Sequence, residues 1–113
     1  MLKKQLRLTR RELTAFFGRR FRVCRGEMLT VRVSRNGSSI TKAAFVVKSS
    51  LTRNAPARNT VRRRLGEVVF ELYSKITPGL DLVFSYTLEK RTAPSFRALK
   101  DDTIKTLSSC GAL

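Results

Sequence analysis

The sequence predicts an α+β domain in which a small β-sheet packs against helices, in the order α-β-β-(β)-α-β-α. Three observations predict this class. Some short apolar segments alternate with the period of a strand, other segments repeat their apolar residues with the period of a helix, and turn residues separate the two kinds. No internal repeat or low-complexity linker divides the 113 residues, so we predict a single domain over residues 1–113.

The first helix is predicted by the residues at its two ends. Thr9 and Glu12 have the T-x-x-E spacing of a capping box, in which each side chain bonds the backbone of the other residue. Leu13, Phe16 and Phe17 share one helix face at the spacing i, i+3, i+4, and Gly18 is a common kind of helix stop. We therefore expect a helix of about two turns that ends near Gly18.

Three segments read as strands. Residues 28–37, "MLTVRVSRNG", alternate apolar and polar side chains and end in an Asn-Gly turn. Residues 42–49, "KAAFVVKS", are apolar on both faces, which predicts a central strand of the sheet. Residues 80–86, "LDLVFSY", alternate again. Whether a short strand also forms around residues 21–23 is left open.

The longest predicted helix covers residues 59–76. Its apolar residues fall within an arc of about 100°, which makes them a core-facing stripe: Val61, Leu65, Val68, Val69, Leu72 and Ile76. Asn59, Arg62 and Arg63 lie together on one flank of this helix, and Arg58 comes just before it. A last helix is expected over residues 95–109.

Positive charge is concentrated in the first part of the chain. Residues 1–65 contain 18 Lys and Arg side chains against two acidic ones, whereas residues 66–113 contain six of each sign. Such a distribution is typical of a folded domain with one binding face for a polyanion. Nucleic acid is the favoured partner, and an anionic membrane surface is the alternative.

Two surfaces are candidates for this binding. Arginines on the flank of the long helix suit phosphate, because a guanidinium can donate to two oxygens and keeps its charge; Asn59 either donates to nucleic acid or caps the helix. A second surface would combine Phe17 and Phe21 with Arg32 and Lys48, since single strands bind by base stacking together with backbone charge. The alternative is that both rings belong to the core.

Residue types suited to catalysis or metal binding are scarce. The chain has no histidine and no nucleophile–base motif, and its one adjacent acidic pair, Asp101-Asp102, is interpreted as a solvated helix face. Two distant cysteines, Cys24 and Cys110, cannot supply a common zinc site and are expected to be reduced, partly buried thiols. With no apolar signal core and no apolar run of membrane-spanning length, we expect a cytoplasmic protein.

The stretch "ARNTVRRRL" resembles the signature of the bacterial ribonuclease P protein subunit, in which an Arg-Asn pair is followed by a basic pair and an aliphatic helix face. The matching positions are Arg58, Asn59, Arg62, Arg63 and Leu65. The segments "LRLTRRELTAFF", "AAFVVKSS" and "PGLDLVF" resemble the first helix and two strands of that family. The resemblance therefore extends over nearly the whole chain.

This resemblance implies a fold and a function. The fold would be a two-layer α/β sandwich with a left-handed βαβ crossover around the arginine helix, against the usual right-handed rule. The chain would be a subunit of an endoribonuclease in which a large RNA, together with Mg²⁺ bound mainly by that RNA, removes the 5′ leader of precursor tRNA. The protein would contribute neither a catalytic residue nor a cofactor site. Its partners would be the RNA subunit and precursor tRNA, with no membrane and no obligate protein partner.

The resemblance also implies roles for individual residues. Contacts with the RNA subunit would come from Arg53, Arg58, Asn59, Arg62 and Arg63. A cleft for the single-stranded leader would be formed by Leu13, Phe17, Phe21, Arg32 and Lys48. Two alternatives share the basic face without this cleft: a non-catalytic protein of ribosomal or chaperone type that binds structured RNA, and a DNA-binding structural protein, for which the sequence has no recognition helix.

Overall fold

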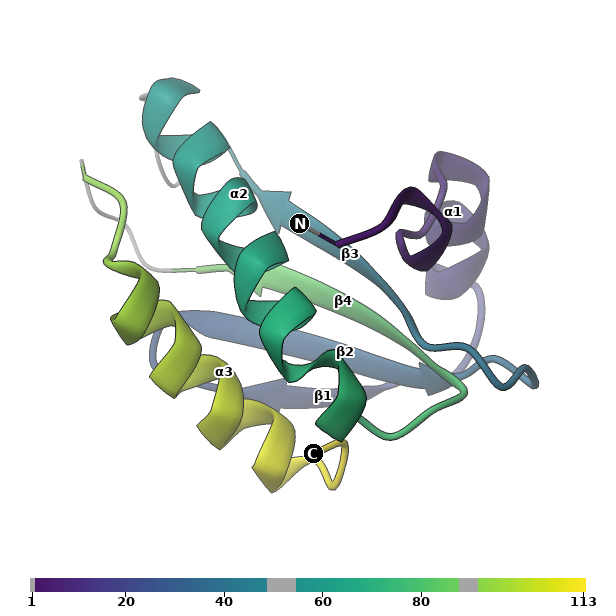
Figure 1. The fold of residues 1–113 in the computed structure, drawn as a ribbon. Helices are drawn as coiled ribbons and strands as arrows, with labels where there is room; N and C mark the ends of the chain where they lie inside the picture. The colour runs from purple at the N-terminus through teal and green to yellow at the C-terminus, as the bar shows by residue number, and fades with distance from the viewer. Residues whose placement is uncertain (1, 49–54, 88–91) are drawn as a thin grey trace.

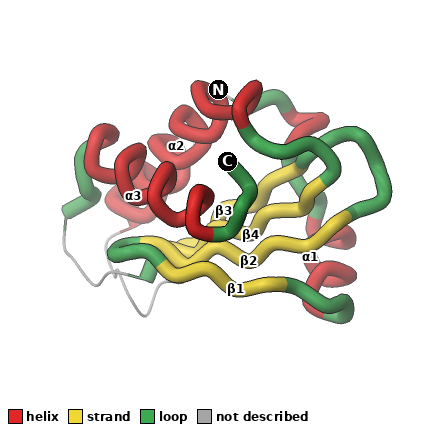
Figure 2. The backbone as a smooth tube through the Cα atoms, turned by 90° about the horizontal axis from the view of Figure 1, so that it is seen from below, coloured by secondary structure: helices red, strands yellow, loops and turns green. Residues whose placement is uncertain are grey.

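The structure, a computed structural model, describes residues 2–48, 55–87 and 92–113. Its four-stranded sheet has the order β1-β2-β4-β3. The strands are β1 (Arg22–Arg25), β2 (Leu29–Arg35), β3 (Lys42–Val47) and β4 (Leu80–Tyr86). The helices are α1 (Arg10–Phe17), α2 (Ala55–Leu72) and α3 (Phe96–Ser109), with short 3-10 turns η1 (Lys4–Leu6) and η2 (Tyr73–Lys75). Helices α2 and α3 cover one face of the sheet, and α1 lies on the other side (Figures 1 and 2).

The connection from β3 through α2 to β4 is a left-handed crossover. Strand β3 pairs with β4 in parallel, while β1 with β2 and β2 with β4 are antiparallel. In Figure 1, α2 lies in front of the sheet, β3 and β4 both run from right to left, and β4 lies below β3, which is the left-handed arrangement. The two-layer α+β architecture is therefore confirmed, with the strand around residues 21–23 present as β1.

The main core lies between the sheet and the helices α2 and α3. Alternate residues of each strand point to this side, and they meet the apolar stripe of α2, as the periodicity predicted. The side chains buried here include Val31, Leu65, Val68, Leu82, Phe84, Leu99 and Leu107. Burial of this apolar surface is the main force that fixes α2 and α3 on the sheet.

Helix α1 forms as its sequence predicts. The Thr9 hydroxyl accepts a hydrogen bond from the Glu12 amide over 3.1 Å, and the Glu12 carboxylate accepts one from the Thr9 amide over 2.9 Å. The Gly18 residue caps the other end. Phe16 is fully buried, and so is Val83, whose side chain points to the α1 side of the sheet because its neighbours in β4 point to the core. A small apolar contact layer thus forms under α1.

The prediction that residues 42–49 form a central strand is wrong. Strand β3 lies at the edge of the sheet, and the N-terminal segment pairs with its outer side at Ala43, whose carbonyl accepts from the Leu8 amide over 2.9 Å. The apolar character of both faces has another cause. One face packs under α2, and the other begins beside α1, where Lys42 Nζ lies 2.8 Å from Glu12 Oε2. An edge strand whose two faces are both covered has the same apolar sequence pattern as a central strand.

The long helix begins earlier than predicted, at Ala55 rather than at Asn59, and ends at Leu72 before a 3-10 turn. Asn59 therefore lies inside the helix, so its interpretation as the N-cap is wrong. The last helix matches its prediction, and the Ser95 hydroxyl accepts from the Ala98 amide over 3.1 Å as its N-cap.

The interpretation of Asp101-Asp102 as a solvated helix face is right for Asp101, which is exposed, and wrong for Asp102. Asp102 is not on a solvated face: it is 5% exposed, and its carboxylate accepts hydrogen bonds from the amides of Glu27, Met28 and Leu29 at 2.8 to 3.0 Å. A Cβ atom at Gly26 would lie 2.8 Å from this carboxylate, so the close approach requires glycine. Asp102 thus holds the turn between β1 and β2 against α3.

The cysteines form a disulfide rather than free thiols. Cys24 on β1 and Cys110 at the end of α3 have Cα atoms 6.0 Å apart, a separation typical of disulfides, although 86 residues separate them in the chain. They meet because α3 packs against β1 and β2, a tertiary contact that residue counting does not show.

Candidate nucleic-acid interface

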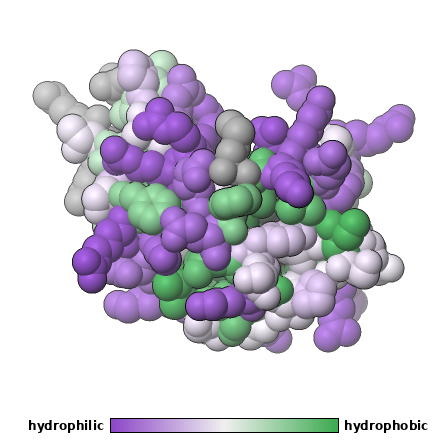
Figure 3. All heavy atoms as spheres, viewed as in Figure 1, coloured by the Kyte–Doolittle hydropathy of each residue, from purple (hydrophilic) through white to green (hydrophobic). Residues whose placement is uncertain are grey.

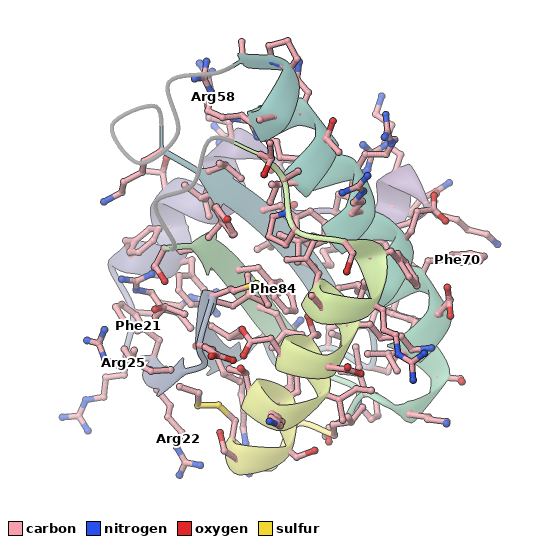
Figure 4. All side chains as sticks on the ribbon, turned by 90° about the vertical axis from the view of Figure 1, so that its left-hand side faces the viewer. Phe21, Arg22, Arg25, Arg58, Phe70 and Phe84 are labelled. Atoms are coloured by element: carbon pink, nitrogen blue, oxygen red, sulfur yellow. A yellow bond between two sulfur atoms is a disulfide. The ribbon has the colours of Figure 1, made fainter. Side chains whose placement is uncertain are left out.

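The basic flank predicted for the long helix lies on the first half of α2. Arg62 and Arg63 are exposed, and Arg58, one turn earlier, is half-buried (Figure 4). Arg62 Nη1 donates to Asn59 Oδ1 over 3.0 Å, and its Nη2 donates to the Val47 carbonyl over 3.4 Å. These contacts hold the Arg62 guanidinium between α2 and the end of β3. Arg53 lies outside the described residues.

Three phenylalanines form an aromatic cluster at the end of α1. The ring centroids of Phe16 and Phe17 are 5.4 Å apart, those of Phe16 and Phe21 5.2 Å, and those of Phe17 and Phe21 5.8 Å. Phe16 is fully buried and Phe21 half-buried, whereas Phe17 is 50% exposed. The alternative that the rings of both Phe17 and Phe21 belong to the core is therefore wrong for Phe17, which offers a ring to solvent, while Phe21 is partly covered.

A cation lies beside this exposed ring. The guanidinium carbon of Arg32, on β2, is 5.9 Å from the Phe17 centroid, within the range of a cation–π contact. Arg32 Nη1 also donates to Ser85 Oγ on β4 over 3.0 Å. Lys48 follows β3 directly and is exposed. Arg32, Ser85 and Phe17 thus form a surface on the α1 side of the sheet.

Leu13, the remaining residue of the predicted leader cleft, lies on α1. It is half-buried and lines a cavity of about 420 Å³ between the N-terminal segment, β3 and α2, together with Arg62 and Arg63. No pattern in the sequence indicates this cavity, because residues from three distant segments form it. Phe45 and Gly66 also line it, and their periodicity marks them only as strand and helix residues.

Arg19 has a structural role. Its Nη2 lies 2.7 Å from Asp81 Oδ2, and its Nη1 donates to the Arg35 carbonyl over 3.2 Å. The buried Asp81 carboxylate also accepts from Asn36 Nδ2 over 3.0 Å. Because a buried carboxylate requires such partners, Arg19 fixes the end of α1 against β4.

The Glu12–Lys42 ion pair makes a second link between α1 and the sheet. The hydrogen bond from Lys42, together with that from the Thr9 amide, lowers the pKa of Glu12 from its ordinary 4.5 to about 2. The same hydrogen bond raises the pKa of Lys42. Both side chains are therefore charged at neutral pH.

Hydrophilic side chains gather over the first half of α2 and over α1, with apolar surface between them (Figure 3). Figure 4 shows Arg58 at the start of α2 and Phe21 and Arg25 on the side of the sheet away from α2 and α3, while Phe70 points outward from α2.

Within the described ranges, no group of three or more His, Cys, Asp or Glu side chains could hold a metal ion. None of the helices in those ranges is long and apolar enough to span a membrane.

Comparisons with known proteins place the chain in a family. The family model described as Ribonuclease P matches residues 2–111. The chain is 37% identical over 75 residues to the Ribonuclease P protein component of Roseiflexus castenholzii, a match that covers 64% of this chain and 61% of that protein. It is 33% identical over 81 residues to the protein of the same name from Roseiflexus sp., covering 69% and 66%. The matched region thus spans less than two thirds of either relative.

Solved structures show the same fold. The RNase P protein of Thermotoga maritima aligns with a TM-score of 0.75 at 20% identity, covering 91% of this chain and 96% of that one. A Staphylococcus aureus RNase P protein mutant with defective mRNA degradation activity aligns with a TM-score of 0.81 at 16% identity, covering 97% and 92%. From its sequence match over almost all of its length, this chain belongs to the ribonuclease P protein family.

Proposed function

We propose that this chain is the protein subunit of a ribonuclease P holoenzyme that matures the 5′ end of tRNA. It binds the RNA subunit through the basic flank of α2 and the 5′ leader of precursor tRNA on the α1 side of the sheet. The observation that supports this most strongly is that an exposed aromatic ring and an anchored arginine lie together on one surface, while further exposed arginines lie on another.

The α2 flank suits a folded RNA. Arg62 and Arg63 are exposed on a rigid helix, so their guanidinium groups can bind phosphates without a large loss of backbone freedom. Asn59 orients Arg62 through its Oδ1, and its side-chain nitrogen is a donor type that suits a phosphate or ribose oxygen. We include Arg58, which lies on α2 one turn before Arg62, and Arg53, which comes shortly before α2 in the sequence, because the family resemblance implies a role for both.

The surface beside α1 suits a single strand. Phe17 offers a stacking face, Phe21 supports it within the aromatic cluster, and Arg32 and Lys48 supply charge for the backbone. Leu13 extends the apolar side of α1 toward the neighbouring cavity. Because base stacking and backbone charge do not depend on the identity of the base, we expect this surface to bind leaders of different sequence.

In this proposal the RNA performs the cleavage. Mg²⁺, held mainly by the RNA, supplies the charge stabilisation that phosphodiester cleavage needs. The protein positions the substrate and reduces repulsion between two polyanions, which fits its net charge of +16. The reaction therefore requires no general base from this chain.

A binding experiment tests the leader site. The affinity of the holoenzyme, assembled from this chain and a cognate RNA, is measured for precursor tRNA and for mature tRNA. We expect tighter binding of the leader-bearing form, with a difference that depends on the protein. Equal affinities would contradict the leader site and would favour a protein that binds structured RNA without recognising substrate.

A further inference from the structure

The cavity between the N-terminal segment, β3 and α2 adjoins the surface proposed for the leader, and Leu13 belongs to both. Its volume is about 420 Å³, within the range of about 300–1,000 Å³ common for small-ligand pockets. Most of its lining is apolar, with Leu2, Leu8, Leu13 and Phe45 among the residues. A ligand that enters it must therefore have an apolar part.

The charged side chains around the cavity specify the rest of the ligand. Arg7, Arg62 and Arg63 line it, and Glu67 is the acidic residue of the lining. The exposed arginines favour an anionic group at the edge of the cavity, while the carboxylate of Glu67 disfavours an anion inside it. A nucleotide meets both conditions, because its base is flat and largely apolar and its phosphates lie outside the base.

Gly66 supports a role for the empty space. It lies in the middle of α2, and its φ is not among the positive values found at Gly37, Gly79 and Gly111. A Cβ atom built at Gly66 would meet nothing within 4 Å. Neither backbone conformation nor crowding requires a glycine here, and glycine is unfavourable inside a helix. Its consequence is open space in the cavity wall, between the side chains of Arg62, Arg63 and Glu67.

The edge of the sheet adds polar groups to this wall. Strand β3 is an edge strand, and among the described residues the N-terminal segment bridges it only at Ala43. The cavity begins at the same point, since Ala43, Ala44 and Phe45 all line it. An edge strand presents backbone N–H and C=O groups outward, and these can pair with the edge of a base.

From these observations we propose that this cavity binds one unpaired nucleotide of the RNA subunit, with the base inserted beside Phe45 and Gly66 and the flanking phosphates on Arg7, Arg62 and Arg63. The inference rests on the proposed function, because it assigns a specific contact to the same RNA. It adds a base contact to a surface that otherwise binds only the RNA backbone.

A cavity-filling variant tests this proposal. Gly66→Leu fills the cavity from within α2 and, because leucine favours helix, should melt no lower than the unmodified protein. Gly66→Ala adds a single methyl group and should weaken binding of the RNA subunit less than Gly66→Leu does. Ser108→Leu is the matched control, since it places the same side chain on an exposed position of α3.

Affinity for the cognate RNA subunit is measured over a range of salt concentrations. We expect Gly66→Leu to weaken binding by about 5- to 150-fold, the range for loss of one stacked base, with an unchanged salt slope because no phosphate contact is lost. Chemical probing of the RNA backbone should show one unpaired nucleotide that the unmodified protein and Ser108→Leu protect and Gly66→Leu does not.

The outcomes separate the two proposals. If the unmodified chain does not bind the RNA, the proposed function is wrong. If it binds tightly, and Gly66→Leu binds as tightly with the same protection pattern, only the nucleotide pocket is overturned. A loss of affinity accompanied by a flatter salt slope would also overturn the pocket, because it would mean that the substitution displaced arginine–phosphate contacts instead.

Discussion

The guanidinium of Arg32 lies over the exposed ring of Phe17, with its carbon 5.9 Å from the ring centroid, and the hydrogen bond to Ser85 holds it there. This pair joins β2 to the end of α1. It places one stacking face and one fixed charge side by side on the surface that we assign to the leader, so each can be tested separately.

Phe17→Ala should reduce the preference of the holoenzyme for precursor over mature tRNA by about 1–3 kcal/mol, the contribution of one stacked base. Phe70→Ala is a closely matched control, because Phe70 on α2 is 49% exposed and Phe17 is 50% exposed. The measurement is the equilibrium affinity for both tRNA forms. Equal loss in both variants, or a loss of fold without a selective effect, would contradict stacking by Phe17.

Replacing Arg62 and Arg63 by alanine should weaken binding of the RNA subunit and flatten the salt dependence of log K by roughly 0.7–0.9 for each lost phosphate contact. The double variant Arg97→Ala with Lys105→Ala removes the same charge from exposed positions of α3 and should leave the slope nearly unchanged. Filter binding at several salt concentrations measures both. Identical slopes for the two double variants would show that α2 has no special contact with the RNA backbone.

Asp102→Ala should destabilise the fold by about 3 kcal/mol or more, because it leaves three backbone amides of the β1–β2 turn without their acceptor. The neighbouring Asp101 is exposed, so Asp101→Ala should change the free energy of unfolding by less than about 0.5 kcal/mol. Urea denaturation of both variants checks this. Similar stabilities would mean that Asp102 does not hold the turn.

Loss of the disulfide by Cys110→Ser should lower the free energy of unfolding by about 2–4 kcal/mol, since the bond closes a long loop in the unfolded chain. Cys24→Ser should have nearly the same effect, and the double variant should lose little more, because all three remove one bond. Additive losses in the double variant would contradict the pairing. Denaturation of the unmodified protein with and without a reductant provides an independent measurement.

The Glu12–Lys42 ion pair should make the stability of the fold depend on pH in the acidic range. The pKa of Glu12 is lowered to about 2 in the folded protein, so its contribution is complete above the unfolded value near 4.5 and is lost as pH falls toward 2. Because both side chains are partly exposed, this contribution should be below about 1 kcal/mol. Glu12→Gln should therefore reduce, by that amount, the fall in the free energy of unfolding between pH 5 and pH 2. The measurement is urea denaturation at several pH values, and an identical pH dependence in the variant and the unmodified protein would show that the ion pair does not contribute.

Patterns among neighbouring residues predicted the helices that such residues determine. The capping box of Thr9 and Glu12 predicted α1, and the apolar stripe from Val61 to Leu72 predicted most of α2. Pro56 in the first turn of α2 is a signal that could have placed the helix start earlier, since proline is favoured there.

The remaining features depend on tertiary contacts. Strand β3 lies at the edge because, of the four strands, it pairs only with β4. The apolar character of its two faces does not determine this position. Asp102 and Cys110 acquire their roles only because α3 packs across β1 and β2. The cavity beside Gly66 combines three segments, so periodicity along the chain could not show it.

Cleavage of precursor tRNA at low Mg²⁺ tests the central claim most directly. Three reactions are compared: this chain alone, a cognate RNA subunit alone, and both together. We expect no cleavage by the protein alone, slow cleavage by the RNA, and much faster cleavage by the two combined. Cleavage by the protein in the absence of RNA, or no increase when it is added to the RNA, would contradict a protein that supplies charge and position to a catalytic RNA.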